Sequence, residues 1–184
     1  MSLNFHVNSL FSSISYRIEG VLIDPGDEWE GFDNVDKVLL THAHFDHIYG
    51  INRVLEMNPE VKVYSNEIGR EMLLNAKKNL SRYHESPIVI LKPDAIVTVN
   101  DGDEMDLDNG ITAKAVFTPG HNPSCITWII GDAIFTGDSY IPGIMTVTNL
   151  PDADKRLAAQ SESLILSLAK GKTILPGHNV VSAS

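Results

Sequence analysis

Three histidines and one aspartate lie within a six-residue stretch that follows an apolar run. The stretch occurs in LLTHAHFDH and contains His42, His44, Asp46 and His47. Imidazole nitrogens and carboxylate oxygens are ligands for zinc, iron and manganese. The pattern therefore indicates a metal site. Taken alone, Asp46 would serve equally well as the N-cap of a helix that begins at His47 or Ile48.

Three further candidate ligands follow apolar stretches later in the chain. His121 follows AVFTPG, Asp138 follows AIFTG and His178 follows TILPG. Each of them alone would be an ordinary turn residue. Side chains at strand ends converge when the strands share a sheet, because the strand termini then meet at one edge. Together with the histidine-rich stretch, these residues predict one metal site at the edge of a sheet.

The single cysteine and the two remaining histidines are expected to lie outside that site. Cys125 cannot form an internal disulfide or a structural zinc site built on paired cysteines. It heads an apolar stretch and is predicted to be a small core residue, with a soft ligand near His121 as the alternative. His6 and His84 are predicted to be structural or solvated. For His84 the alternative is a place in a substrate cleft.

The composition predicts a globular protein with one domain over residues 1–184. Apolar residues make up 43% of the chain, which suffices for a substantial core. We expect a cytoplasmic protein without a membrane partner, because no stretch approaches the ~20 apolar residues of a membrane helix and no secretory signal is evident. The net charge is −10 and no basic run exceeds Lys77-Lys78, so nucleic acid is not an expected partner. The oligomeric state is open.

Apolar periodicity predicts strands and helices that deliver these side chains. The predicted strands cover residues 3–7, 13–18, 21–26, 35–41, 61–65, 111–118, 125–131, 133–137 and 172–177. The predicted helices cover residues 48–58, 66–80 and 152–171. Asn66 is the predicted N-cap of the second helix, and Ile68 is expected on its buried face. In the acidic segment 100–110, alternating apolar residues favour a half-exposed strand over a calcium loop.

The motifs around the candidate ligands resemble those of the metallo-β-lactamase superfamily. THAHFDH resembles the His-x-His-x-Asp-His signature of that superfamily, and TPGHNPSC, FTGD and LPGH resemble its other ligand motifs in the same order. The resemblance extends from VLIDPG to LPGH. It implies an α/β fold, a four-layer αββα sandwich, with a two-metal site at one edge.

The resemblance also implies a role for each candidate ligand. The residues implied for the first metal are His42, His44 and His121. The residues implied for the second metal are Asp46, His47 and His178, with Asp138 bridging the two metals. Asp24 in VLIDPG would support the ligands without contacting a metal. The cofactor is expected to be two divalent ions, with zinc as the leading identity and iron and manganese as the alternatives.

Such a site would carry out hydrolysis. Two ions that share one water lower its pKa to near neutrality, which makes hydroxide available as a nucleophile, while an open position polarises a substrate carbonyl. Asp46 is the expected catalytic residue, because it would orient the hydroxide and could accept its proton. The positive site would attract a carbonyl or anionic oxygen although the chain is acidic overall.

Within the superfamily, the chain is most similar to the small hydroxyacylglutathione hydrolases, the glyoxalase II group. Asp138 separates it from the true lactamases, and His44 separates it from the flavodiiron members, which have a glutamate there. The sequence lacks a basic residue between Asp138 and Lys155, and only a short segment follows His178, so a glutathione site stays an open question.

We therefore expect a zinc-dependent hydrolase of a small thioester or ester. The alternatives are a lactonase, a mononuclear iron oxygenase similar to persulfide dioxygenases, and a non-catalytic binding protein. The candidate residues for contact with a small-molecule substrate are Tyr140, Arg82 and Tyr83.

Overall fold

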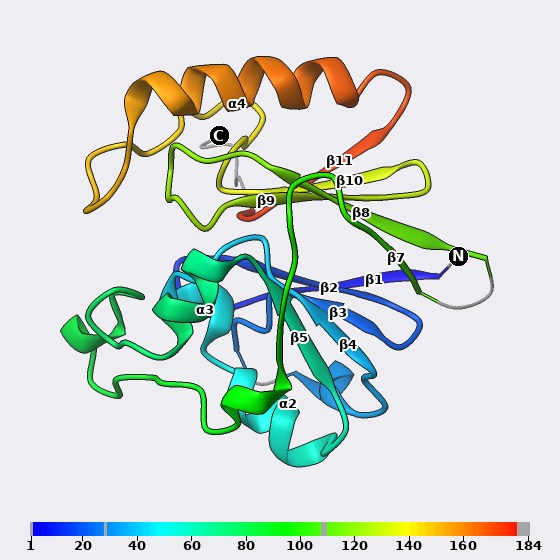
Figure 1. Ribbon diagram of the computed structural model, residues 1–184, viewed down its shortest axis with the longest axis vertical. Coiled ribbons are helices and arrows are strands. Elements are labelled where there is room, and N and C mark those ends of the chain that lie inside the picture. The colour runs from blue at the N-terminus through cyan, green and yellow to red at the C-terminus, as the bar shows by residue number, and fades with distance from the viewer. Residues whose placement is uncertain (1, 28, 108–109, 180–184) are drawn as a thin grey trace.

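Two β-sheets face each other at the centre of the computed structural model, which describes residues 2–27, 29–107 and 110–179 (Figure 1). The first sheet has the order β1-β2-β3-β4-β5-β6 and the second the order β11-β10-β9-β8-β7. The strands of the first sheet are β1 (Leu3–Val7), β2 (Ile14–Ile18), β3 (Val21–Ile23), β4 (Lys37–Leu39), β5 (Lys62–Ser65) and β6 (Ile96–Thr98). The strands of the second sheet are β7 (Glu104–Asp106), β8 (Thr112–Phe117), β9 (Ile126–Ile130), β10 (Ala133–Gly137) and β11 (Thr173–Pro176).

Helices cover the outer face of each sheet. The α-helices are α1 (Phe45–Ile48), α2 (Ile51–Met57), α3 (Glu67–Leu73) and α4 (Lys155–Leu168). Single turns of 3-10 helix occur at η1 (Glu30–Phe32), η2 (Ser81–Tyr83) and η3 (Pro93–Ala95). Figure 1 shows α4 over the second sheet and α2 and α3 on the opposite side of the molecule. This arrangement confirms the expected four-layer αββα sandwich.

The sandwich has one apolar core between the sheets and another beneath the first group of helices. Trp128 and Phe135 from the second sheet pack with Leu39 from β4 in the core between the sheets. Val38 and Leu40 point the other way, into the core below α1 and α2. Because successive strand residues face opposite sides, an almost continuous apolar run such as β4 indicates a strand buried on both faces.

Strand direction brings the candidate ligands together. Strand β4 pairs in parallel with β3 and β5, and β11 pairs in parallel with β10. The segments that leave β3 and β4, and those that leave β10 and β11, therefore start at common edges of the two sheets. This explains why chemically important side chains follow several separate strands in the sequence.

The predicted strands are all present, but two predicted helices are wrong in extent. The helix expected over 48–58 is divided into α1 and α2, and Asp46 lies inside α1 instead of capping a helix. Asn66 is confirmed as the N-cap of α3, where its Oδ1 accepts from the Gly69 N–H at 2.8 Å. That helix ends at Leu73, not near residue 80, and Ile68 is 43% exposed, so its expected burial is wrong.

The early end of α3 has a local cause. The Asn75 side chain accepts hydrogen bonds from the backbone N–H groups of Lys77 and Lys78 at 3.0 and 3.3 Å. Asparagine side chains compete in this way with helical hydrogen bonds. In the acidic segment, β7 confirms the expected strand, while residues 108–109 lie outside the described part of the chain. None of the described helices is long and apolar enough to cross a membrane.

Candidate metal centre

Asp24 organises the loop that carries the histidine-rich stretch. Its carboxylate accepts from the Thr41 backbone N–H at 2.7 Å and also from the Thr41 hydroxyl. The same carboxylate lies 3.0 Å from Nδ1 of His47. Asp24 is buried and has a φ of 51°, a left-handed conformation that costs a non-glycine residue about 1 kcal/mol. These contacts hold Asp24 in that conformation and fix the start of the ligand loop.

The structure brings together all seven side chains for which ligand roles are expected. They form three groups, and within each group the ligand atoms lie within 4.8 Å of one another. The groups are His42, His44 and His121; His42, His47 and Asp138; and Asp46, His47 and His178. His42 and His47 each belong to two groups, so the three groups form one continuous cluster of ligand side chains. These seven side chains are called the metal cluster below.

Asp138 lies at the centre of this metal cluster. Its Oδ2 is 3.5 Å from Nε2 of His121 and 3.3 Å from Nε2 of His178. Its Oδ1 is 3.4 Å from Nε2 of His47. The two oxygens thus face different histidines, as a carboxylate shared between two cations would.

Contacts on the outer side fix the orientation of several rings. Nδ1 of His121 lies 2.9 Å from the Val147 carbonyl oxygen, and Nδ1 of His178 lies 2.9 Å from the Phe11 carbonyl oxygen. A carbonyl oxygen only accepts, so Nδ1 of each ring carries the hydrogen. In a neutral ring, Nε2 then presents its lone pair to the centre of the cluster, as a metal ligand requires.

The donor set fits divalent metal ions. Nε2 of His42 is buried and has no hydrogen-bond partner among the described residues. A buried unpaired polar atom costs about 1–3 kcal/mol, and a cation coordinated by this nitrogen would remove that cost. Buried imidazoles and carboxylates that converge in this way suit zinc, iron or manganese.

Burial and neighbouring charges set the protonation of the metal cluster. Burial, together with the charges of His47 and His44, holds the pKa of His42 well below its usual range. Burial and the nearby His121 lower the pKa of His44 to about 3. Burial alone would raise the pKa of Asp138, but His47 and His178 outweigh it and keep that pKa low. His42 and His44 are therefore neutral imidazoles beside an ionised carboxylate, the forms of these groups that bind a cation. Burial lowers the pKa of His47 and of His178, but nearby carboxylates, Asp138 in both cases, outweigh it and raise both pKa values.

Glycines directly precede three of the ligands, because there is no room for a side chain. A Cβ at Gly120, before His121, would overlap the backbone of Ala158. A Cβ at Gly137, which has a φ of 50°, would lie 2.4 Å from Oγ1 of Thr41. A Cβ at Gly177 would lie 2.4 Å from Oδ1 of Asp138. The Gly-Asp and Gly-His sequences thus reflect close backbone approach at the site.

Helix α4 holds the segment that carries His121 in place. The Ser161 hydroxyl donates to the Pro119 carbonyl at 2.6 Å, and the Asp154 N–H donates to the Gly120 carbonyl at 2.8 Å. The side chain of Asp154 also caps the helix by accepting from the backbone of Arg156 and Leu157. The helix end is therefore anchored next to His121.

A cavity of about 580 Å³ opens over the metal cluster. Its floor is formed by the side chains His44, Asp46, His121, Asp138 and His178. Its walls are formed by Phe11, Phe45, Leu80, Tyr83, His84, Val147, Leu150 and Pro151. Of the three residues expected to contact a substrate, Tyr83 lines this cavity, whereas Arg82 and Tyr140 are not among its lining residues.

The aromatic part of the wall has no clear signal in the sequence. The rings of Phe45 and His84 have centroids 3.8 Å apart, and Phe11 meets Phe45 edge-on at 5.7 Å. His84 thus packs on Phe45 and lines the cavity, which agrees with a structural role and with the alternative place in a cleft. Cys125 is a buried core residue as expected, and burial raises the pKa of its thiol to about 12.

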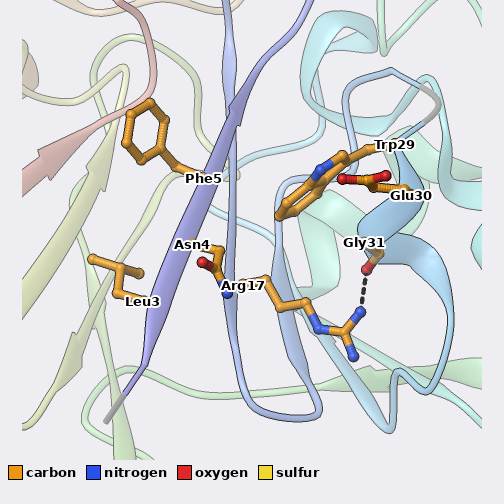
Figure 2. A pocket seen from close by; sticks show the side chains of 7 residues that line it. All are labelled: Leu3, Asn4, Phe5, Arg17, Trp29, Glu30 and Gly31. Atoms are coloured by element: carbon orange, nitrogen blue, oxygen red, sulfur yellow. Dashed lines mark hydrogen bonds between the residues drawn. The ribbon is translucent and has the colours of Figure 1, made fainter.

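A second hollow, of about 560 Å³, lies around Arg17 and Trp29 (Figure 2). Figure 2 shows the Arg17 guanidinium directed at the Gly31 carbonyl, to which it donates at 2.6 Å. The same guanidinium also donates to the Asn34 carbonyl and contacts Asp33. His6 stacks on Trp29 with centroids 5.6 Å apart, which agrees with its expected structural role. The Arg17 guanidinium is thus engaged by groups of the protein itself.

Residues 15–178 match the family model of the metallo-beta-lactamase superfamily. The chain belongs to this superfamily. This confirms the resemblance carried by the ligand motifs. The cluster of histidines and aspartates is therefore the candidate metal site of a superfamily member.

Individual relatives agree with this placement. The chain is 29% identical over 172 residues to the probable metallo-hydrolase YqgX of Bacillus subtilis, covering 88% of this chain and 77% of the relative. It is 28% identical over 141 residues to a hydroxyacylglutathione hydrolase of Xylella fastidiosa, covering 73% of this chain but only 46% of that enzyme. The crystal structure of TTHA1623 in a di-iron-bound form has a TM-score of 0.80 and 25% identity, covering 96% of this chain and 92% of that chain.

Proposed function

We propose that this chain is a zinc-dependent hydrolase that uses a pair of divalent ions to cleave a small thioester or ester. One observation carries the proposal: seven side chains from separate segments converge, and a buried nitrogen of His42 among them has no hydrogen-bond partner within the described residues. Structural histidines normally satisfy both ring nitrogens, so an unpaired nitrogen among further ligand atoms indicates a cation site.

The arrangement suggests how the ligands divide between two ions. The proposed ligands of the first ion are His42, His44 and His121. The proposed ligands of the second ion are Asp46, His47 and His178. Asp138, with oxygens toward both sets of histidines, would be shared, and Asp24 would support His47 from behind.

When bound, such ions supply Lewis acidity for a carbonyl and lower the pKa of water to near neutrality. The protein contributes position and proton transfer. The Asp46 carboxylate lies on the cavity floor with Oδ2 3.4 Å from Nε2 of His178. A carboxylate there would orient the attacking water and take up its proton.

The thioester or ester class is supported by the relatives and by the size of the cavity. A hydroxyacylglutathione hydrolase is among the relatives, but the chain matches less than half of its length, so its substrate does not transfer directly. A cavity of about 580 Å³ suits a small molecule. A lactone is an internal ester and therefore belongs to the same substrate screen.

The test combines metal analysis with a substrate panel. We expect close to two metal ions per chain, mostly zinc, and a large fall in both metal content and hydrolysis in His121→Ala. The panel should contain thioesters, linear esters, lactones and phosphodiesters. A metal-loaded chain that cleaves none of them would refute the proposal.

A mononuclear iron oxygenase is the second candidate. TTHA1623, at 25% identity, was crystallised in a di-iron-bound form, which supports iron as the metal but not a site with a single iron. Histidine and carboxylate ligands accept iron as well as zinc, so the ligand set does not decide between them. One iron per chain with uptake of oxygen, and without hydrolysis, would select this candidate over the first.

A further inference from the structure

Apart from the metal cluster, the lining of the cavity is predominantly hydrocarbon. Two polar aromatic residues, Tyr83 and His84, complete the wall. The apolar wall is formed by Phe11, Phe45, Leu80, Val147, Leu150 and Pro151. No lysine or arginine lines the cavity within the described part of the chain.

The apolar wall is held in place before any ligand binds. Leu80 has a φ of 69°, which is strained for a leucine. The preceding residue, Asn79, is fully buried, and its amide donates to the carbonyls of Met72 and Ile88 at 3.1 and 2.9 Å. The Val147 carbonyl oxygen is hydrogen-bonded to Nδ1 of His121. A preorganised wall lowers the entropic cost of binding a ligand of matching shape.

Several apolar wall residues remain exposed at the mouth of the cavity. Phe11 is 64% exposed and Val147 is 46% exposed. Large apolar side chains that stay exposed beside a cavity are typical of ligand-binding surfaces. Away from the metal ligands, the described lining of the cavity offers no lysine or arginine to pair with an anionic group of a ligand. The apolar lining and the lack of a pairing cation in its described part therefore both favour an apolar ligand without a negative charge.

We propose that the substrate is a neutral thioester or ester whose acyl group is an aliphatic chain or an aromatic ring, and not an anionic conjugate such as a glutathione thioester. This inference rests on the proposed hydrolase function. The carbonyl would lie over the metal cluster, and the acyl group would contact Leu80 and Leu150. Water adds to the carbonyl carbon, the carbon–sulfur or carbon–oxygen bond breaks, and the products are a carboxylic acid and a thiol or alcohol.

The test varies the acyl group and the thiol part of a thioester separately. Acetyl and hexanoyl thioesters of N-acetylcysteamine, which is uncharged, differ only in apolar length. We expect kcat/KM to be at least about tenfold higher for hexanoyl, since each fully buried methylene contributes about fourfold. Hexanoyl glutathione carries the same acyl group on a larger thiol part whose carboxylates give it a net negative charge, and should be about tenfold poorer. Equal rates for acetyl and hexanoyl, or a preference for the glutathione thioester, would overturn the inference.

Binding measurements separate this inference from the proposed reaction. If no substrate of the panel is cleaved, the hydrolase proposal fails, but the ligand class can still be measured. Titration calorimetry would compare two thioethers that cannot be hydrolysed, S-hexyl-N-acetylcysteamine and S-hexylglutathione. Tighter binding of the neutral thioether supports the inference. Tighter or equal binding of the glutathione thioether, or no binding of either compound, overturns it.

A matched pair of variants on one loop tests the apolar wall directly. Leu150→Lys places a charge in the wall and should reduce the hexanoyl-to-acetyl ratio about tenfold. Met145→Lys adds the same charge to a side chain that is 84% exposed and does not line the cavity, so its ratio should stay within about twofold of the parent. Should Leu150→Lys fail to fold, Leu150→Ala should lower the ratio about threefold. An unchanged ratio in folded Leu150 variants with full metal content would contradict the proposed role.

Discussion

The metal cluster and the apolar wall line the same cavity but are built in different ways. The cluster is buried and polar, and it stands at strand ends where outer partners such as Asp24 and the Val147 carbonyl hold each ring. The wall is apolar and partly exposed, and it comes mainly from loops around residues 11, 80–84 and 147–151, with Phe45 contributed by α1. The cluster depends on the backbone of the wall, since the carbonyls of Phe11 and Val147 accept from ligand rings. Changes confined to wall side chains should therefore alter substrate choice and leave the ligands in place.

The largest effect should come from removing a central ligand of the metal cluster. His42→Ala is expected to lose most of the bound metal and at least about 10³-fold in kcat/KM, because His42 belongs to two of the three ligand groups. Elemental analysis beside circular dichroism would separate metal loss from unfolding. His6→Ala is the control, since His6 stacks on Trp29 away from the cluster. Full metal content in folded His42→Ala would contradict the proposed role of His42 as a metal ligand.

A positioning residue of the metal cluster should have a smaller effect on metal binding. Asp24→Ala removes the acceptor for both the Thr41 N–H and His47, so we expect metal affinity to fall about 10- to 100-fold. Competition with a chelator measures this change. Asp24→Asn retains one acceptor and tolerates the left-handed φ, and should recover part of the affinity. Equal affinity in all three proteins would remove Asp24 from the support of the cluster.

Tight packing beneath the metal cluster can be measured as stability. Gly137→Ala should lower the free energy of unfolding by about 3 kcal/mol, because the left-handed φ and the contact with Thr41 both become unfavourable. Gly131→Ala is the control: it has a φ of 59° but no atom within 4 Å of the added Cβ, and should cost only about 1 kcal/mol. Urea denaturation of metal-free protein would test both values. Equal losses of unfolding free energy in the two variants would mean that the left-handed φ alone, and not the contact with Thr41, requires glycine at position 137.

The wall should respond in substrate binding and not in metal content. Tyr83→Ala is expected to raise KM about three- to tenfold with unchanged metal content, because Tyr83 lines the cavity but is 69% exposed. Arg82→Ala changes the neighbouring side chain, which does not line the cavity, and KM should stay within about twofold. Steady-state kinetics with elemental analysis would give both quantities. Metal loss in Tyr83→Ala would show that this wall residue also supports metal binding and would contradict the prediction.

The smallest effect is expected at Cys125, behind the metal cluster. Its pKa is raised to about 12 by burial, which favours the neutral thiol. At pH 8 only about one thiol in 10⁴ would be ionised, so labelling of the folded protein should be very slow. Reaction with a thiol reagent, followed by mass spectrometry before and after urea denaturation, tests this. Rapid labelling of the folded chain would show that Cys125 is accessible.

Local patterns account for the strands and for the identity of the candidate ligands. Residues that alternate or run continuously apolar predicted β4 and β9, because side-chain direction in a strand depends only on position. Asn66 was predicted as an N-cap because that role needs only a neighbouring backbone N–H. The extent of α3 was not predictable in this way, since its end depends on hydrogen bonds made by Asn75 and Asn79 to nearby backbone.

The sequence by itself therefore determined the superfamily, the sandwich and a set of candidate ligands, because each rests on short motifs or local periodicity. That residues 1–184 form one domain stays a prediction. Only the tertiary structure decided that His84 faces the cavity while Arg82 does not, and that Phe11 and Leu150 share its wall. These residues are far apart in the chain and follow no local pattern. Their proximity arises from how the loops pack over the two sheets, which is a property of the folded chain as a whole.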